Sequence, residues 1–422
     1  MRILIASDHY PPFVGGVQRQ TRALALELLA RGHSVCVATV WQDDLPAFED
    51  RDGFEVHRLR QLRSAPFIRG RSRRRHQPPF PDPVTAVALR RLIRRLKPDL
   101  VHGMGWFSYS AAAALVGTRI PLVASAREYG LSCANASLLH DGAPCSGPGP
   151  VKCLGCSARY FGTGRGTVAY AGVRVSAPLL RRKVTAIHSV SRYVRDIVAR
   201  DFLRGAAERV PQTVISPFRL EEDAAPDEAF LARLPHEPFL LFVGALRRAK
   251  GVEQLYEAYA GLEDPPPLVL LGTTEWDVVS DPPPGVHALG SASNATVLAA
   301  WDRSLFGVMP SLWPEPFGSV VHEAMSRGRA VIGTTPGGHE DMIEHERTGL
   351  LVAPGDVGEL RAALRRLIED APLRTALGRR ARERAALFTA EHALPQFEAL
   401  YRRHAGRGHG RVSDHRALAG EA

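Results

Sequence analysis

The chain has 422 residues, a formal net charge of +10 and 45% hydrophobic residues. This length predicts two domains of about 200 residues rather than a single core. No apolar run reaches the about 18 residues that a membrane helix needs, which excludes a membrane span. The apolar start of the chain ends at Asp8 and is too short for a signal peptide, so we expect a cytosolic protein.

The charge divides the chain into two unlike halves. Residues 1–216 hold 32 Lys and Arg against 15 Asp and Glu, whereas residues 217–422 hold 22 against 29. The densest cluster comprises Arg69, Arg71, Arg73, Arg74 and Arg75. It suits an anionic membrane surface or an acidic acceptor, and a solvated loop is the equal alternative. The arginines are not interleaved with aromatic residues, so we expect no nucleic acid partner.

Residues 1–216 alternate between short apolar runs and amphipathic segments. Seven strands are predicted, at 2–7, 34–40, 55–59, 100–103, 122–126, 183–189 and 213–216. An amphipathic helix is expected over 17–31. Strands that alternate with helices predict a parallel, doubly wound, Rossmann-like sheet. Gly15 and Gly16 precede the first helix at the carboxyl end of the first strand, where such sheets bind ligands.

Residues 127–170 interrupt this alternation with a stretch rich in Gly, Pro and Cys, which we interpret as a long functional or mobile loop. The stretch carries four of the five cysteines: Cys133, Cys145, Cys153 and Cys156. This cluster with its Cys-x-x-Cys pair is typical of either a structural zinc site or free or redox-active thiols, and stable disulfides are the third alternative. Cys36, in an apolar strand, is expected to be a core residue.

The second half, after an acidic linker at 216–237, repeats the α/β pattern. Six strands are predicted, at 239–243, 268–271, 286–289, 306–310, 330–333 and 349–352. We therefore expect a second Rossmann-like domain over 217–388, a helix over 389–404 that packs back on the N-terminal domain, and a flexible tail over 405–422. The loop after its first strand carries Gly244, Arg247, Arg248 and Lys250, and such cations suit a pyrophosphate.

The stretch 310–325 combines a strand end, a Pro-rich turn and a helix start. Gly318 lets a ligand approach the backbone, and the free N–H groups of Ser319 and Val320 suit a phosphate. Glu323 lies one turn into the helix, and Glu315 lies on the turn. Taken alone, each acid is better explained by an ordinary structural role, Glu323 as a helix-start acid and Glu315 as a solvated loop acid.

Glu315 and Glu323, within Pro-Ser-Leu-Trp-Pro-Glu-Pro-Phe-Gly, match a Glu-x7-Glu pattern. With this pattern, the second half resembles the retaining, GT-B-fold glycosyltransferases of family 4, also called glycosyl transferases group 1. The Cys-rich loop is similar to that of one subgroup. The N-terminal half resembles the acceptor domain of the family through Gly15, Gly16 and the Leu-Val-His sequence that ends at His102.

The resemblance implies a role for each motif. Glu323 is expected to bind the ribose, Lys250 and a nearby Arg the diphosphate, and the backbone of Gly318, Ser319 and Val320 the phosphates. Further contacts to the donor sugar are implied for Glu315, Phe317 and Gly318, and the catalytic set is expected to include Glu315, Arg127 and His102. The transfer is expected to need no divalent metal.

Two positions depart from the family pattern. Ala245 stands where the family has Arg, so Arg247 or Arg248 has to supply the clamp. Arg127 stands where many members have His, and it either takes a donor or acceptor role or anchors the loop through Glu128. The sequence thus predicts a hexosyltransferase that uses a nucleotide diphosphate sugar and a glycan, lipid-linked or small-molecule acceptor, with peripheral membrane contact. A nucleotide-sugar-binding protein without transfer activity is the alternative.

Overall fold

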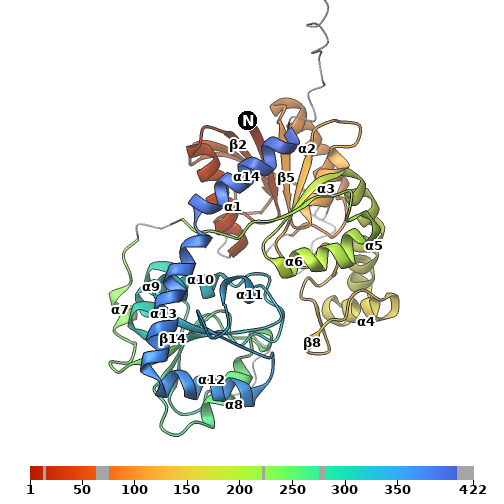
Figure 1. Cartoon of the computed structure of the whole chain (residues 1–422). Helices are drawn as coiled ribbons and strands as arrows, with labels where there is room; N and C mark the ends of the chain where they lie inside the picture. The colour runs from red at the N-terminus through yellow and green to blue at the C-terminus, as the bar shows by residue number, and fades with distance from the viewer. Residues whose placement is uncertain (13–15, 63–75, 221–223, 275–280, 406–422) are drawn as a thin grey trace, which may run out of the picture.

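The computed structural model describes residues 1–12, 16–62, 76–220, 224–274 and 281–405, which form two α/β units (Figure 1). Each unit has its own sheet of mainly parallel strands. Alternate residues of the first strand enter different hydrophobic clusters, Leu4 and Ala6 on one face and Ile3 and Ile5 on the other. Because both faces are buried, the strand is continuously apolar. The prediction of two doubly wound sheets is confirmed.

The N-terminal sheet has the strand order β10-β9-β6-β5-β1-β2-β4-β3, and the edge strand β3 alone runs antiparallel to its neighbour among these described strands. Its strands are β1 (Arg2–Ser7), β2 (Ser34–Val40), β3 (Phe48–Arg51), β4 (Phe54–Leu59), β5 (Leu100–Met104), β6 (Leu122–Ala126), β9 (Val184–Ser189) and β10 (Gln212–Val214). Seven agree with the predicted runs to within two residues at each end, and β3 was not predicted.

The helices of this unit connect its parallel strands. They are α1 (Gly16–Ala30), α2 (Pro83–Leu96), α3 (Phe107–Ala114), α4 (Pro150–Phe161), α5 (Thr163–Lys183), α6 (Arg192–Ile197), a π-helical turn η3 (Val198–Leu203) and a 3₁₀ turn η4 (Arg204–Ala206). Helix α2 begins at a local signal, because the Asp82 carboxylate accepts the Thr85 N–H.

The stretch 127–170 is more ordered than the predicted loop. It contains a hairpin of two-residue strands, β7 (Leu139–His140) and β8 (Ala143–Pro144), followed by α4 and the start of α5. Helix α4 starts with Pro150 at its first turn, and a glycine with positive φ, Gly162, separates it from α5. Pro at a helix start and Gly at a helix end are favoured positions, so the residues that suggested a loop act as helix boundaries.

The C-terminal sheet has the order β13-β12-β11-β14-β15-β16 with parallel neighbours throughout. Its strands are β11 (Phe239–Val243), β12 (Leu268–Leu271), β13 (Val286–Gly290), β14 (Ser304–Val308), β15 (Ala330–Thr334) and β16 (Leu350–Val352). Strand β14 lies two residues before its predicted position, since Pro310 has no N–H to continue the ladder.

The C-terminal unit carries helices of varied length around this sheet. They are α7 (Glu228–Leu231), a 3₁₀ turn η5 (Arg248–Lys250), α8 (Val252–Ala260), α9 (Asn294–Arg303), α10 (Ser319–Ser326), α11 (His339–Met342), α12 (Val357–Glu369), α13 (Ala371–Ala385) and a 3₁₀ turn η6 (Ala386–Phe388).

The last helix, α14 (Ala390–Ala405), returns to the N-terminal unit and lies near α1 and β5 (Figure 1). Its buried residues Leu394, Phe397 and Tyr401 join the same hydrophobic cluster as Ile3 of β1. The chain thus crosses between the units twice, once between β10 and the C-terminal unit and once before α14. The predicted tail lies outside the described residues beyond Ala405. No helix in the described ranges is long and apolar enough to cross a membrane.

Candidate functional site in the cleft between the two units

A cleft of about 810 Å³ lies between the two units, where the carboxyl ends of strands from both sheets meet. Residues of both halves line it: Ser7, Asp8, His9, Val17, His76, Met104, Gly105, Trp106, Arg127, Glu128, Asn135, Ala136, Ser137, Leu139, Asp141, Cys156, Arg159, Tyr160, Arg247, Ala249 and Trp313. Three predicted site residues are among them: Arg127, Arg247 and Cys156.

Two sets of contacts connect the halves beside this cleft. The Tyr129 hydroxyl donates to the Pro314 carbonyl at 2.6 Å. The guanidinium and backbone N–H of Arg192 both donate to Asp341, each at 2.8 Å. The turn that carries Glu315 is therefore held against the N-terminal unit.

The turn after β14 leads into α10 through Gly318, which has a φ of 87°. A Cβ at this position would lie 2.6 Å from the imidazole of His339, so glycine is required both for the backbone angle and for the space. No side chain caps the helix, and the first N–H groups of α10, at Ser319 and Val320, are oriented as in an anion-binding helix start.

Glu315 is 5% exposed and accepts hydrogen bonds from Lys250 Nζ at 2.5 Å and Ser311 Oγ at 2.6 Å. Burial alone would raise the pKa of this carboxyl, but Lys250, His339 and the two hydrogen bonds outweigh it and lower the pKa to about 2. Glu315 is therefore a fixed, ionised acceptor at neutral pH. Sequence patterns could not identify its pairing with Lys250, because the two residues lie 65 positions apart.

Trp313 connects this ion pair to the cleft. Lys250 Nζ lies 5.4 Å from the centroid of the Trp313 ring, and Arg247 Cζ lies 5.9 Å from it. Trp313 and Arg247 both line the cleft. The aromatic ring orients the two cations, and it was not predicted as a site residue.

The structure separates the two arginines that the sequence left as alternatives. Arg247 lines the cleft, and its buried Nε has no hydrogen-bond partner in the described residues. The Arg248 side chain is 66% exposed and forms an ion pair with Glu253 at 3.3 Å. Of these two arginines, Arg247 is therefore the one whose guanidinium is available to a ligand. Gly244, with a φ of 154°, directly follows β11 and begins this loop.

Glu323 lies in α10, is 4% exposed and forms an ion pair with Arg219 of the interdomain segment. This pairing was not predicted, and it places a further cation next to the helix start. The Phe317 side chain is 4% exposed and packs edge to face on Phe388 at 5.9 Å. Phe317 therefore contributes backbone rather than its ring to the surface near Gly318.

The N-terminal wall carries a charged group at the end of β6. Burial lowers the pKa of Arg127 to about 9, and its buried Nε has no partner among the described residues. Burial raises the pKa of Glu128 to about 7, although its carboxylate accepts the Gly130 N–H at 2.6 Å. Burial also raises the pKa of Asp8, whose Oδ2 accepts the Trp106 N–H at 2.7 Å. Asp8 and Glu128 were not predicted, although each follows a strand end.

His102 does not lie in the cleft. It is fully buried in β5, where Tyr401 donates to Nδ1 at 2.7 Å and Nε2 donates to Ser125 Oγ at 2.6 Å. Ser125 in turn bonds to His188 Nδ1, and His188 Nε2 donates to the Ile215 carbonyl. Burial lowers the pKa of His102 and lowers that of His188 to about 4, so both rings are neutral. The catalytic expectation for His102 is replaced by a structural one, because α14 covers it.

Gly16 begins α1, next to the cleft-lining Val17, whereas Gly15 and the arginine cluster at residues 69–75 lie outside the described residues.

A glycine pair of the C-terminal unit, Gly337 and Gly338, packs on the backbone of the turn that carries Glu315, and Gly338 N–H donates to the Glu315 carbonyl at 2.6 Å. The following His339 is buried, with a pKa lowered to about 4 by burial. His339 directly follows these two glycines, and that position is the sequence signal from which its place beside the turn could have been predicted.

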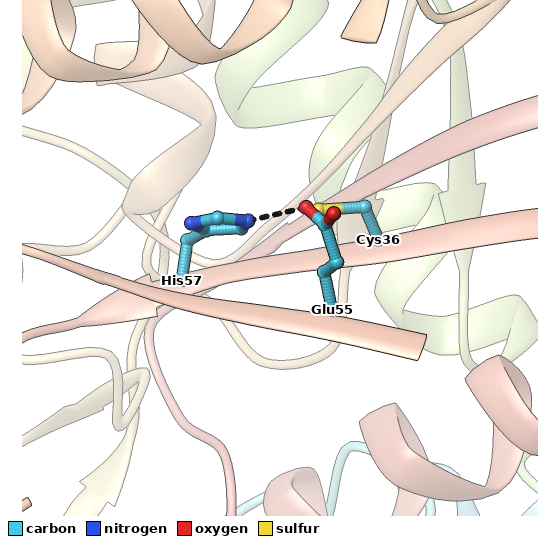
Figure 2. Close-up of side chains that lie close together, drawn as sticks. All are labelled: Cys36, Glu55 and His57. Atoms are coloured by element: carbon cyan, nitrogen blue, oxygen red, sulfur yellow. Dashed lines mark hydrogen bonds and ion pairs between the residues drawn. The ribbon is translucent and has the colours of Figure 1, made fainter. Parts of the chain in front are cut away.

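One group of metal-ligand types lies on the N-terminal sheet, away from the cleft residues. Cys36 of β2 faces Glu55 and His57 of β4, and His57 Nε2 lies 2.7 Å from Glu55 Oε2 (Figure 2). Arg95 donates to Glu55 at 2.7 Å and approaches His57 Nε2 at 3.0 Å. A cation already compensates this cluster, so it does not need a metal. Cys36 is 7% exposed, as expected for a core residue.

Family comparisons match both halves of the chain. Residues 15–217 match the glycosyl transferase 4-like domain, and residues 227–384 match the glycosyl transferases group 1 domain. Among curated relatives, glycogen synthase of Mycobacterium tuberculosis is 28% identical over 415 residues, which cover 91% of this chain and 90% of the relative. An uncharacterised glycosyltransferase of Methanocaldococcus jannaschii is 24% identical over 387 residues, 88% of this chain and 90% of the relative.

Solved structures agree with the fold. Sucrose-phosphate synthase of Thermosynechococcus elongatus superposes with a TM-score of 0.68 at 20% identity, covering 95% of this chain and 98% of that one. Anabaena HepE in complex with UDP gives a TM-score of 0.67 at 16% identity, covering 96% and 100%. These likenesses confirm the predicted GT-B fold. With both domain models matched in order, the chain belongs to the group 1 glycosyltransferases of the family 4 type.

Proposed function

We propose that the protein is a retaining hexosyltransferase that moves a sugar from a nucleoside diphosphate to a glycan, lipid-linked or small-molecule acceptor. The observation that carries the proposal is the buried Glu315, held by Lys250 and Ser311 beside the uncapped start of α10. Burying the negative charge of Glu315 costs free energy of folding, and a ligand-binding role explains why the fold maintains this charge.

The donor occupies the C-terminal side of the cleft in this proposal. Its diphosphate lies against the N–H groups of Ser319 and Val320, and Lys250 and Arg247 compensate its charge. The ribose hydroxyls donate to the carboxylate of Glu323, and Arg219 holds that carboxylate in place. Two anionic acceptors suit two diols, because hydrogen bonds to charged groups are stronger than neutral ones.

The chemistry consists of the departure of the diphosphate and the arrival of an acceptor hydroxyl on the same face of the sugar. Glu315 accepts hydroxyls of the donor sugar and fixes its orientation, and the cations stabilise the charge that develops on the leaving group. These roles belong to Lys250 and Arg247, so the proposal includes no divalent ion.

The acceptor lies against the N-terminal wall, where Arg127, Glu128 and Asp8 line the cleft. With a pKa of about 7, Glu128 both accepts and releases a proton near neutral pH, which suits contact with an acceptor hydroxyl. The excess of positive charge in residues 1–216 favours an anionic acceptor or a membrane surface that carries one. Sedimentation with anionic and neutral liposomes tests this surface contact, which requires selective binding to the anionic vesicles.

Two structural relatives support the donor class. HepE is described in complex with UDP-glucose, and the catalytic domain of starch synthase IV of Arabidopsis thaliana is described with ADP and acarbose. The shared part of these ligands is a nucleoside diphosphate. Since the two relatives carry different bases, the base of the donor has to be found by screening.

A thermal-shift screen with UDP, GDP, ADP and TDP tests the proposal. A ligand at about 100 times its Kd adds about 2.7 kcal/mol of stability, which raises Tm by several degrees. We expect one nucleotide to give such a shift, and its sugar conjugates to be hydrolysed or transferred. No shift with any of the four would refute the donor site. Binding without turnover of any conjugate would favour the alternative, a nucleotide-sugar-binding protein.

A further inference from the structure

The four cysteines of the stretch 133–156, hereafter the cysteine insert, surround a single cavity of about 50 Å³. Cys133 precedes the β7-β8 hairpin, Cys145 follows it, and Cys153 and Cys156 lie on α4. All four line the cavity, and all are free thiols. Segments that lie up to 23 residues apart in the chain therefore bring four sulfurs to one place.

The cysteine insert has little hydrophobic core to explain its order. Of the residues of α4, Ser157 alone is buried, whereas Val151 is 87% exposed and Tyr160 is 64% exposed. The hairpin strands have two residues each and are partly or fully exposed. A two-stranded hairpin is only marginally stable alone, so another interaction has to fix this region.

Hydrogen-bond donors already point at two of the sulfurs. The Gly149 N–H donates to Cys153 Sγ at 3.3 Å, and Asn135 Nδ2 donates to Cys156 Sγ at 3.3 Å. Both sulfurs lie in the first two turns of α4, whose N-terminus has no side-chain cap. Lys152 and Arg174 also line the cavity and add positive charge at its wall.

We propose that Cys133, Cys145, Cys153 and Cys156 bind a metal centre through their thiolates. Four thiolates select zinc or an iron–sulfur cluster over harder ions. In the described residues no three of these sulfurs lie within 4.8 Å of one another. A zinc tetrathiolate with bonds of about 2.3 Å needs sulfurs about 3.8 Å apart, so zinc requires the sulfurs to move closer together, whereas an iron–sulfur cluster spans a wider gap.

The centre would also fix one wall of the cleft. Asn135 donates to Cys156 Sγ, and both residues line the cleft together with Ser137 and Tyr160. The metal centre therefore positions the surface against which the acceptor lies, a consequence that rests on the proposed function. The metal binding itself does not depend on that function.

Metal analysis of the full-length protein, purified under anaerobic and reducing conditions, tests the proposal. The parent is compared with Cys153→Ser/Cys156→Ser and with Cys36→Ser, which removes a cysteine outside the insert. We expect the parent and Cys36→Ser to carry either one zinc per chain or iron with sulfide and a visible absorption band, and the double variant to lose it. Metal in the parent at the background level of the double variant would overturn the proposal.

Thiol reactivity of the parent protein provides a second measurement if the double variant does not fold. We expect the four insert thiols to resist a thiol reagent under native conditions and to react after a strong chelator is added. Chelation should also expose the insert to trypsin at Lys152 or Arg159. Thiols that react equally with and without chelator, or that form disulfides in the native protein, would contradict metal binding.

Nucleoside diphosphate titration separates this inference from the proposed function. The double variant should keep the parent's nucleotide affinity within about twofold, because the donor residues lie in the other unit, and should lose transfer to the acceptor. A parent that binds metal but no nucleotide would contradict the donor site and leave the metal centre supported. A double variant that lacks metal but transfers normally would refute the role in the cleft wall.

Discussion

Replacing Arg247 by Ala should weaken nucleoside diphosphate binding, whereas replacing its neighbour Arg248 should not. The two residues are adjacent on the loop after β11, and both were equal candidates in the sequence. Arg247 lines the cleft and lies 5.9 Å from the Trp313 ring, whereas the Arg248 side chain is 66% exposed and paired with Glu253. Arg248→Ala is therefore a matched control for Arg247→Ala, because the two side chains have the same charge and length and are adjacent in the sequence.

The size of the effect follows from the contacts that each guanidinium can form. Hydrogen bonds to a charged group contribute about 1.5–3 kcal/mol, which corresponds to an increase in Kd of about 10- to 150-fold for Arg247→Ala. The position of Arg247 near Trp313 reduces the entropy cost of fixing its side chain, so we expect the middle of this range. Loss of the exposed Arg248 ion pair contributes less than about 1 kcal/mol to stability and nothing to a diphosphate contact.

Isothermal titration calorimetry with the nucleotide found by thermal shift measures both variants against the parent. Circular dichroism and thermal unfolding confirm that each variant is folded. We expect Arg247→Ala to raise Kd by at least tenfold and Arg248→Ala to change it by less than twofold. Equal effects of the two substitutions, or a larger effect at Arg248, would refute the assignment of the diphosphate clamp.

Three other substitutions test the account. Glu323→Ala should raise Kd for the nucleoside diphosphate by about tenfold through loss of the ribose contact, and calorimetry with unchanged affinity would disprove that contact. Gly318→Ala places a Cβ 2.6 Å from His339 at a φ of 87°. Urea unfolding should therefore show a free energy of unfolding lower by about 1–3 kcal/mol, and nucleotide binding should be weaker. Parent-like stability and parent-like binding would together argue against the tight helix start. Burial raises the pKa of Glu128 from 4.5 to about 7, so the folded state favours the protonated carboxyl. The contribution of Glu128 to the free energy of unfolding is therefore fully present below pH 4.5 and is lost as the pH rises through about 7. Glu128→Gln should therefore gain about 3 kcal/mol relative to the parent between pH 4 and pH 8, and a difference that does not change with pH would contradict this.

The parallel sheets could be predicted because their strands are buried on both faces. Strands such as β1 and β11 are continuous apolar runs between polar turns, and this pattern needs no knowledge of the partners. The edge strand β3, with the sequence Phe-Glu-Asp-Arg, lacks the pattern because its side chains are largely exposed on both faces. Helix α4 was missed because its boundary residues, Pro and Gly, were read as loop residues.

The candidate site was predictable in part. The helix start at Gly318 and the acids Glu315 and Glu323 were legible from local spacing, since turn, glycine and helix follow one another in the chain. Their partners were not legible, because Lys250 lies 65 residues before Glu315 and Arg219 lies in the segment between the units. Long-range ion pairs leave no local pattern.

His102 illustrates the opposite error. The family resemblance implied a catalytic role for His102, but the ring points into a core that is closed by Tyr401, 299 residues later in the chain. Nothing within the strand distinguishes the two directions. A buried histidine whose two nitrogens are both hydrogen-bonded is a structural residue, and this could be recognised only from the packed C-terminal helix.

The most direct test of the central claim compares transfer and binding in Glu315→Gln, which keeps the shape of the side chain and removes its charge. We expect transfer of the donor sugar to fall by at least about 30-fold, corresponding to about 2 kcal/mol of transition-state stabilisation, while Kd for the free nucleoside diphosphate stays within about threefold of the parent. Parent-like transfer by Glu315→Gln would contradict the claim that this buried carboxylate orients the donor sugar.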